Sequence, residues 1–325
     1  MQDPNKWVYR LTENEINEVL AAVGSLRDKN LEISAIRKKD FVLPLLSEKL
    51  DRVLKDVTKG RGFALIRGLP VERLNEKDNR LMYWGLTLHF GAAAPQNMMG
   101  ELISDVRAIH GDWNKNHHIR GYQTRVHLPF HCDKADLVSL LCLQTAKSGG
   151  MSWISSSIAI HNEILDTDTK ILKALYEPFY IDHRGEHFDG ENPFYISPIF
   201  SIHKGQLFTR FGQKYVETAQ RFPQVPRLSS EQSTGMALFS ELAISERFRL
   251  DMQFDRGDLQ LLNNHLIVHS RSDYEDWSEP DRRRHLLRMI FLSKEIGESP
   301  THIRSLNTFI KRWGKNPRNS VLETT

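Results

Sequence analysis

The sequence predicts an α+β protein that is mainly β, with a helical N-terminal region packed on a β core. Three observations lead to this fold class. Up to about residue 92, apolar side chains recur at helical spacing. Beyond that point, short β-rich runs alternate with turn residues, a spacing that is typical of a sandwich or barrel. No long periodic helices separate these runs, which disfavours a doubly wound parallel sheet.

The N-terminal region contains three predicted helices and one short strand. Thr12 and Glu15 form a capping-box pattern that predicts the start of the first helix. Apolar residues on one helical face predict a second helix near 45–58 and a third near 74–90. Between these two helices, 63–66 is predicted to be a buried strand, because glycine and proline bound a short apolar run.

The remaining chain is predicted to form the β core, with two helical inserts near 160–175 and 234–248. The predicted strands are 107–109, 138–144, 154–156, 199–202, 206–210, 258–262 and 286–292. A length of 325 residues alone suggests about two domains. Because no linker or repeat interrupts the chain, we instead expect one domain over 1–325. It would comprise a helical part (1–92), a core (93–310) and a loosely ordered tail (311–325).

Composition limits the possible function classes. The net charge of +3 does not call for nucleic acid as a partner, so we expect a small-molecule substrate. Two cysteines against 14 histidines exclude a disulfide scaffold and a thiolate zinc site, so a metal would be held by histidines and carboxylates. No apolar run is long enough to span a membrane, and the N-terminus lacks a signal-peptide pattern. We therefore expect a cytoplasmic protein without a membrane partner; the sequence does not indicate its oligomeric state.

Three His-x-Asp pairs are candidate metal ligands, because residues i and i+2 of an extended segment face the same side. The pairs beginning at His110 and His187 lie in polar, loop-like surroundings. The pair His131 and Asp133 precedes the buried-looking run 137–143 and therefore lies at the rim of the β core. This pair is the best candidate for a rigid metal site.

The third ligand must come from far along the chain. The segment LLNNHLIVHSR contains His265 and His269, which face the same side if the segment is extended, so spacing alone leaves both open. Two histidines and one carboxylate on one face of iron form the facial triad of non-haem Fe(II) oxygenases.

A nearby arginine block adds a second chemical requirement. Arg284 and Arg288 flank an apolar, strand-like run in DRRRHLLRMIFL. An arginine in a buried strand needs an anion, and its planar fork suits a carboxylate. A metal triad beside such arginines describes a site for a small dicarboxylate or keto acid.

The ordered motifs HCD, SGGMS, NNHLIVHSR and RRRHLLR resemble those of Fe(II)/2-oxoglutarate-dependent oxygenases of the taurine dioxygenase superfamily. The resemblance is closest to the clavaminate synthase-like branch. It extends through GFALIRGLP and APQNMMGELISDVR, and so covers nearly the whole chain. It implies a double-stranded β-helix, or jelly roll, with helices packed outside.

The resemblance also implies roles for individual residues. His131, Asp133 and His269 match the iron ligands, and His269 is preferred to His265 by its place before the arginine block. Arg284 and Ser152 match the residues that bind the distal carboxylate of 2-oxoglutarate, and Arg288 matches an arginine that faces its keto-acid end or the prime substrate. Because Asp133 is retained, halogenation is disfavoured. Strand alternation is expected to turn Cys132 away from the iron.

The expected reaction consumes O2 and 2-oxoglutarate and releases succinate and CO2. The substrate would be hydroxylated, or else desaturated or cyclised, and we expect a small polar compound such as an amino acid derivative or a natural-product intermediate. Predicted pocket residues are Gln96, Asn97, Tyr122, Gln123, Phe130 and Arg288, and the polar segment 114–127 is either a lid or an ordinary surface loop. Two alternatives stay open: a zinc-type metallohydrolase and a non-catalytic β-sandwich that binds small molecules.

Overall fold

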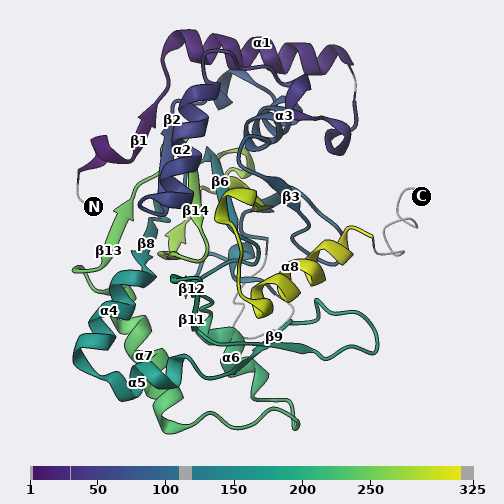
Figure 1. Ribbon diagram of the computed structural model, residues 1–325. Coiled ribbons are helices and arrows are strands. Elements are labelled where there is room, and N and C mark those ends of the chain that lie inside the picture. The colour runs from purple at the N-terminus through teal and green to yellow at the C-terminus, as the bar shows by residue number, and fades with distance from the viewer. Residues whose placement is uncertain (1–2, 30, 110–118, 316–325) are drawn as a thin grey trace.

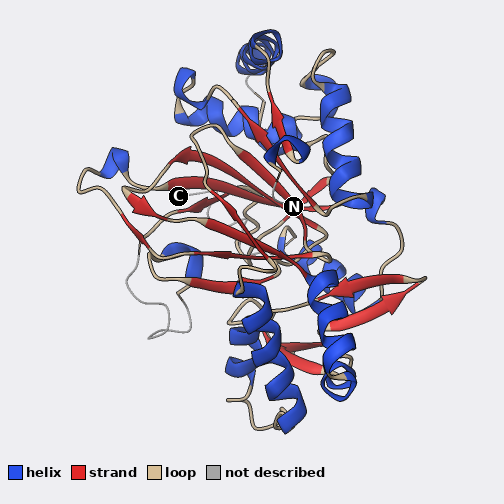
Figure 2. Ribbon diagram, turned by 90° about the vertical axis from the view of Figure 1, so that its left-hand side faces the viewer, coloured by secondary structure: helices blue, strands red, loops and turns tan. Residues whose placement is uncertain are grey.

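The computed structural model describes residues 3–29, 31–109 and 119–315. Two sheets lie in the middle of the molecule, with helices on either side of them (Figures 1 and 2). The larger sheet contains, in spatial order, β1 (Val8–Arg10), β2 (Phe63–Arg67), β14 (Leu259–Asn263), β6 (Leu137–Gln144), β17 (His285–Leu292) and β3 (Ala92–Ala94), with β4 (Ser104–Val106) also paired to β17. The smaller sheet contains β13 (Arg249–Met252), β8 (Ser152–Ser156), β15 (Ile267–Arg271) and β5 (Leu128–His131). All pairs in these two sheets are antiparallel except β1 with β2.

The larger sheet is buried on both faces, which explains its nearly continuous apolar runs. In β6, Leu137 and Leu141 pack into the apolar cluster beneath the N-terminal helices. Their neighbours Val138 and Cys142 pack into a second cluster, which also contains Ile154 of the smaller sheet. The second cluster is therefore the core between the two sheets.

Three helices cover the outer face of the larger sheet: α1 (Glu13–Lys29), α2 (Ser47–Lys59) and α3 (Glu76–Thr87). The predicted capping box at the start of α1 is confirmed. The backbone N–H of Thr12 donates to Oε2 of Glu15 (2.7 Å), and the N–H of Glu15 donates back to Oγ1 of Thr12 (3.4 Å). Lys49 of α2 also reaches the Glu15 carboxylate at 2.5 Å, which ties the two helices together.

The outer face of the smaller sheet meets a second group of helices. These are α4 (Ser157–Thr167), α5 (Thr169–Leu175), α6 (Gln213–Ala219) and α7 (Ser230–Ile244), accompanied by the hairpins β9 (Phe179–Asp182) with β10 (Phe194–Ser197) and β11 (Phe200–His203) with β12 (Gln206–Thr209). A short pair, β7 (Ser148–Gly149) with β16 (Tyr274–Glu275), completes the strands of the described residues. The helix predicted over 160–175 is divided at Asp168, whose Oδ1 accepts from the backbone N–H groups of Lys170 and Ile171 at 3.0 Å and so begins a new helix.

Two local predictions are wrong. The strand predicted at 107–109 lies upstream, as β4, where Val106 pairs with Leu286 of β17. The tail predicted to begin at Lys311 instead starts as the end of α8 (Thr301–Trp313). Ile310 and Trp313 are fully buried against the core between the sheets, and this burial holds the last turn in place.

At the level of fold class, the predictions of central β-sheets with outer helices and of a helical N-terminal region agree with the structure. The prediction that the protein is mainly β is not met, because among the described residues the α-helices contain more residues than the strands. Within the described ranges, no helix is both long enough and apolar enough to span a membrane.

Candidate metal centre

The structure brings together His131, Asp133 and His269. His131 ends β5, and His269 is its direct partner across the pairing of β5 with β15. Opposed residues on neighbouring strands share a face, so the two imidazoles lie side by side, with ring centroids 4.3 Å apart. Asp133 follows two residues after His131, and one ligand atom from each of the three side chains lies within 4.8 Å of the others.

The donor atoms of this cluster fit a metal ion. Nδ1 of His131 is engaged by the carbonyl of Pro129 at 2.8 Å, so that Nε2 is the nitrogen left for a metal. Oδ2 of Asp133 is buried and has no hydrogen-bond partner among the described residues. Nε2 of His269 lies 3.5 Å from this oxygen. Buried polar atoms are normally satisfied, and a cation bound between these three side chains would satisfy this one.

Electrostatics favour the forms of the ligands that bind metal. Burial raises the pKa of Asp133, but the positive charge of Arg288 and the contact with His269 outweigh it and hold the pKa well below its usual range. Burial lowers the pKa of His131 to about 3. The carboxylate is therefore ionised and the imidazole neutral at pH 7, as metal ligands must be.

The other candidate histidines lie elsewhere. His265 is buried, with Nε2 3.1 Å from Oδ1 of Asp136, and its ring packs against Phe208. His187 lies in the loop between β9 and β10, where its ring stacks on His183. The pair His110 and Asp112 falls outside the described residues. Of the two histidines that spacing left open, the structure therefore places His269, and not His265, beside His131 and Asp133.

One cavity beside the cluster is rich in arginine, and we call it the arginine cavity. It is lined by the three clustered side chains together with Ser152, Arg271, Arg284, Arg288 and mainly apolar neighbours. Oγ of Ser152 accepts from Nε2 of Gln260 at 3.2 Å. Arg284 is 5% exposed, and its Nη1 has no hydrogen-bond partner among the described residues. The resemblance had indicated Ser152 and Arg284 as neighbours, and both line this cavity.

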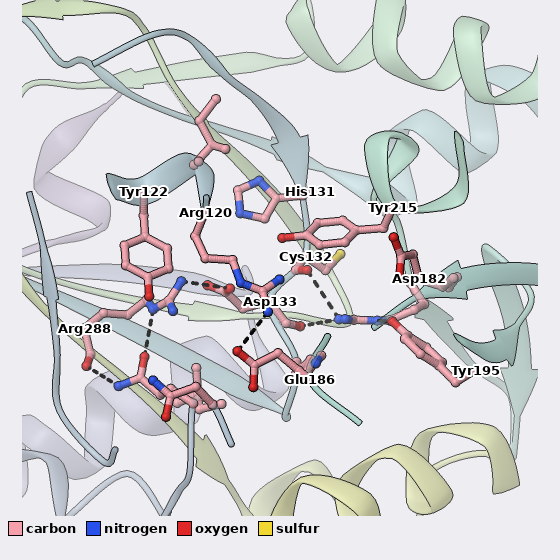
Figure 3. Close-up of a pocket in the computed structure, with 18 residues that line it drawn as sticks. Arg120, Tyr122, His131, Cys132, Asp133, Asp182, Glu186, Tyr195, Tyr215 and Arg288 are labelled. Atoms are coloured by element: carbon pink, nitrogen blue, oxygen red, sulfur yellow. Dashed lines mark hydrogen bonds and ion pairs between the residues drawn. The ribbon is translucent and has the colours of Figure 1, made fainter. Parts of the chain in front are cut away.

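A second cavity meets the first at the cluster, and we call it the mixed-charge cavity (Figure 3). Of the predicted pocket residues, Gln96, Asn97, Tyr122 and Arg288 line it. Its cationic lining also includes Arg120, Lys134 and Arg210, and its acidic lining is Asp133, Asp182 and Glu186. In Figure 3, Arg288 and Tyr122 lie on one side of Asp133, and Tyr195 and Asp182 lie on the other.

Three predicted positions have other environments. Phe130 packs into the apolar cluster beneath α4, α5 and α7, so it does not line the pocket as predicted. Gln123 also turns away, because its Oε1 accepts from the backbone N–H of Arg120 at 3.2 Å. Cys132 packs in the same cluster as Phe130, although it also borders the mixed-charge cavity, and burial raises the pKa of its thiol to about 11. In the segment 114–127, residues 114–118 lie outside the described ranges.

Sequence reasoning missed several charged residues that line the two cavities. Arg271 carried a usable signal, because it follows His269 by two residues in a strand and must share its face. Lys134 also carried a signal, because it directly follows Asp133 in the sequence. Arg120 and Arg210 carried none, because they reach the mixed-charge cavity from other parts of the chain. Arg288 was expected to face a ligand, yet it also pairs with Asp133 at 3.2 Å.

Two sheets that present a partly buried cluster of two histidines and one carboxylate indicate the class of non-haem iron oxygenases. The chain belongs to a family within that class, described as "Taurine catabolism dioxygenase TauD, TfdA family", whose model matches residues 27–290. The finer likeness to the clavaminate synthase-like branch stays a prediction.

Known proteins agree with this membership. FR-33289 synthase of Streptomyces rubellomurinus is 30% identical over 322 residues, which cover 97% of this chain and 92% of the relative. The taurine hydroxylase-like protein SAT17 of Stachybotrys chartarum is 28% identical over 299 residues, covering 89% and 76%. In structure, the chain is similar to asparagine oxygenase in complex with Fe(II), 3-hydroxyasparagine and succinate. The TM-score is 0.68 at 16% identity, covering 88% of this chain and 93% of that one.

Family membership decides among the function classes that the sequence left open. The chain is an Fe(II)- and 2-oxoglutarate-dependent dioxygenase, and not a zinc hydrolase or a non-catalytic binding protein.

Proposed function

We propose that this enzyme hydroxylates a C–H bond of a small substrate that carries an acidic group. The observation that carries the proposal is the cross-strand pair of His131 and His269 with Asp133, placed where two cavities meet. One cavity suits 2-oxoglutarate, because it contains buried arginines near a serine hydroxyl. The other cavity has a lining with more charged and polar side chains, and it suits the substrate.

In this proposal, His131, Asp133 and His269 hold the iron. Arg284 and Ser152 bind the distal carboxylate of 2-oxoglutarate, and Arg288 orients Asp133. When bound at this site, iron with 2-oxoglutarate and O2 supplies the oxidation, in which one oxygen atom enters the substrate and the other enters succinate as CO2 is released. The apolar side chains of the arginine cavity, such as Phe254 and Leu140, limit water there and protect the oxidising step.

The arrangement of the two sheets as a jelly roll is part of the same proposal. We take the larger and smaller sheets, with the core between them, to be the two halves of a double-stranded β-helix. The N-terminal helices and α8 pack on these sheets, which supports a single oxygenase domain over the described residues.

The charges of the mixed-charge cavity support an acidic substrate. Two of its carboxylates are already engaged: Glu186 pairs with Arg120 at 2.9 Å, and Asp182 pairs with Arg221. Asp133 would be neutralised by the metal. Nζ of Lys134 lies 4.3 Å from the ring centroid of Trp313, and no carboxylate of the described residues pairs with it.

Arg210 is also without a carboxylate partner among the described residues, since it donates to the hydroxyl of Tyr195 and to the carbonyls of Cys132 and Asp133. The unpaired guanidinium of Arg210 therefore gives the cavity an excess of positive charge, which an anionic group on the substrate would balance. Lys134 adds only part of a charge near pH 7, because burial lowers its pKa to about 7. The relatives fit this class: one is named for taurine and another for asparagine, and both are small compounds with an acidic group.

The test is an assay of succinate release with matched substrates. Small carboxylates, sulfonates and phosphate esters are each compared with a neutral amide or alkyl ester of the same skeleton. We expect at least one acid to stimulate succinate release roughly tenfold more than its neutral partner, which corresponds to about 1.4 kcal/mol. Stimulation only by neutral or long apolar compounds would contradict the proposed substrate class.

The role of the metal cluster is tested in the same assay with two histidine variants. His269→Ala should abolish both Fe(II) retention and 2-oxoglutarate turnover. The matched control His265→Ala removes a buried histidine of the same segment and should keep both, although it should lower stability by about 1–3 kcal/mol because Asp136 loses a buried partner. Loss of iron from His265→Ala with iron retained by His269→Ala would overturn the assignment.

A further inference from the structure

We infer that Arg271 is a second guanidinium for the distal carboxylate of 2-oxoglutarate, beside Arg284, and that it selects keto acids that carry this carboxylate. The inference rests on the proposed position of 2-oxoglutarate in the arginine cavity. It adds a residue that determines which keto acid the enzyme accepts.

Strand register places Arg271 at the co-substrate site. In the pairing of β15 with β8, Arg271 lies directly opposite Ser152, and His269 lies opposite Ile154. Residues opposed across antiparallel strands project from the same face. Arg271 therefore shares a face with both the metal cluster and the serine hydroxyl, and all three line the arginine cavity.

The hydrogen bonds of Arg271 leave one donor nitrogen unused. Its Nε donates to the carbonyl of Ser272 at 3.1 Å, and its Nη2 donates to the carbonyl of Val126. The whole residue is only 5% exposed, and its Nη1 is buried without a hydrogen-bond partner in the part of the chain that the structure describes. An unsatisfied nitrogen of a buried arginine is costly, so this donor is available to a ligand.

Arg284 repeats this arrangement next to Arg271. It too is 5% exposed, and its Nη1 is also without a partner among the described residues. The guanidinium carbons of Arg271 and Arg284 lie 4.8 Å and 5.1 Å from the ring centroid of Tyr274, so one aromatic ring supports both. Neither guanidinium forms an ion pair with a carboxylate of the described residues.

Two buried cations in one cavity repel each other, and an anion bound between them removes the penalty. A carboxylate has two oxygens and can accept one hydrogen bond from each Nη1. A keto acid that ends in a methyl group offers no acceptor there, so it would leave both donors unsatisfied. The two arginines together therefore favour 2-oxoglutarate over such a keto acid.

The test compares two ligands and four proteins in anaerobic calorimetric titrations in the presence of Fe(II). The ligands are 2-oxoglutarate and 2-oxopentanoate, which has the same chain length but no distal carboxylate. The proteins are the wild type, Arg271→Gln, Arg271→Lys and Arg249→Gln. Arg249 serves as a matched control, because it lies on the same sheet but pairs with Asp251 and lines neither cavity.

We expect Arg271→Gln to weaken binding of 2-oxoglutarate by on the order of 10- to 100-fold and to leave binding of 2-oxopentanoate within about twofold. Arg271→Lys keeps the positive charge but lacks the planar guanidinium, so it should lose less affinity for 2-oxoglutarate than Arg271→Gln. Arg249→Gln should bind both ligands like the wild type. This change in selectivity is a result that a purely structural role would not produce.

A purely structural Arg271, which only anchors the carbonyls of Val126 and Ser272, would weaken both ligands equally or neither, and either result overturns the inference. If Arg271→Gln fails to fold, the ratio of the two affinities in Arg271→Lys decides in the same way. If the wild type itself does not bind 2-oxoglutarate, the proposed function fails as well, so the two failures are distinguishable.

Discussion

Arg288 links the metal cluster to both cavities. Its Nη1 lies 3.2 Å from Oδ1 of Asp133, its Nε donates to Oε1 of Gln96 at 2.8 Å, and its guanidinium carbon lies 4.6 Å from the ring centroid of Tyr122. Gln96 in turn donates to the backbone carbonyl of Arg288 at 2.7 Å. The carboxylate that would bind iron is therefore fixed by a neighbour that is itself fixed on two sides.

Individual residues of the site could be predicted where a local pattern identifies them. His131 and Asp133 are such a case, because a His-x-Asp pair at the start of an apolar run is visible in the sequence. The choice between His265 and His269 depends on strand register, which pairs His269 with His131 and which no spacing rule reveals. Arg210 depends on the same kind of long-range contact, since it reaches the carbonyl of Asp133 from 77 residues away.

His89 provides a pH-dependent test at the scale of one residue. It is 7% exposed, and neither ring nitrogen has a hydrogen-bond partner among the described residues. Burial, with a smaller effect from Lys38, lowers its pKa to about 4. An unfolded histidine binds a proton near pH 6.5. The stability contributed by neutral His89 is therefore complete above that pH and is lost as the pH falls toward 4.

We therefore expect His89→Leu to reduce the loss of stability between pH 7 and pH 5. The unfolding free energy of the wild type should fall by about 2 kcal/mol more than that of the variant over this interval. Urea denaturation at both pH values, followed by circular dichroism, measures the difference. Equal losses in the two proteins would show that His89 is protonated as easily in the folded state as in the unfolded state.

At the scale of elements, prediction succeeds where one period dominates a long run. The helices near 45–58 and 74–90, and the strands at 138–144 and 286–292, agree with α2, α3, β6 and β17 to within a few residues. The strands that carry the histidines of the metal cluster are harder to predict from sequence, because β5 and β15 are short and contain histidine, serine and arginine on buried faces. Function explains this difficulty, because a site requires polar residues where packing alone would select apolar ones.

Helix α3 allows a test in which packing opposes intrinsic propensity. A Cβ added at Gly85 would overlap the ring carbons of Phe41, which is fully buried. Alanine normally stabilises a helix by up to about 1 kcal/mol relative to glycine. We expect Gly85→Ala instead to destabilise the protein by roughly 1–3 kcal/mol, because Phe41 has no free space to move into.

The matched control for this prediction is Gly24→Ala in α1. A Cβ at Gly24 has nothing within 4 Å, so propensity should act alone and stability should rise by up to about 1 kcal/mol. Chemical denaturation of both variants measures whether each substitution raises or lowers the free energy of unfolding. A stabilising Gly85→Ala would mean that α3 and Phe41 are packed less closely than described.

At the scale of the whole molecule, the site is assembled from both sheets. The smaller sheet provides His131, Ser152 and His269, and the larger sheet provides Arg288, with Arg284 directly before β17. The core between the sheets holds these groups at their positions, and α8 covers one end of that core with Ile310 and Trp313. Ligands bound at the site therefore connect two layers that are otherwise held mainly by apolar contacts.

This arrangement predicts that iron and 2-oxoglutarate stabilise the whole fold. A ligand present at 100 times its Kd stabilises the native state by about 2.7 kcal/mol, which for a chain of this size corresponds to a rise in Tm of roughly 4 °C. The measurement is anaerobic thermal unfolding with and without Fe(II) and 2-oxoglutarate, and a chelator should reverse the rise. His131→Ala should unfold near the Tm of the ligand-free wild type and show little of this rise, because the metal loses a ligand while the β5–β15 pairing is retained. A rise of equal size in His131→Ala would place the stabilising ligands somewhere other than the cluster between the sheets.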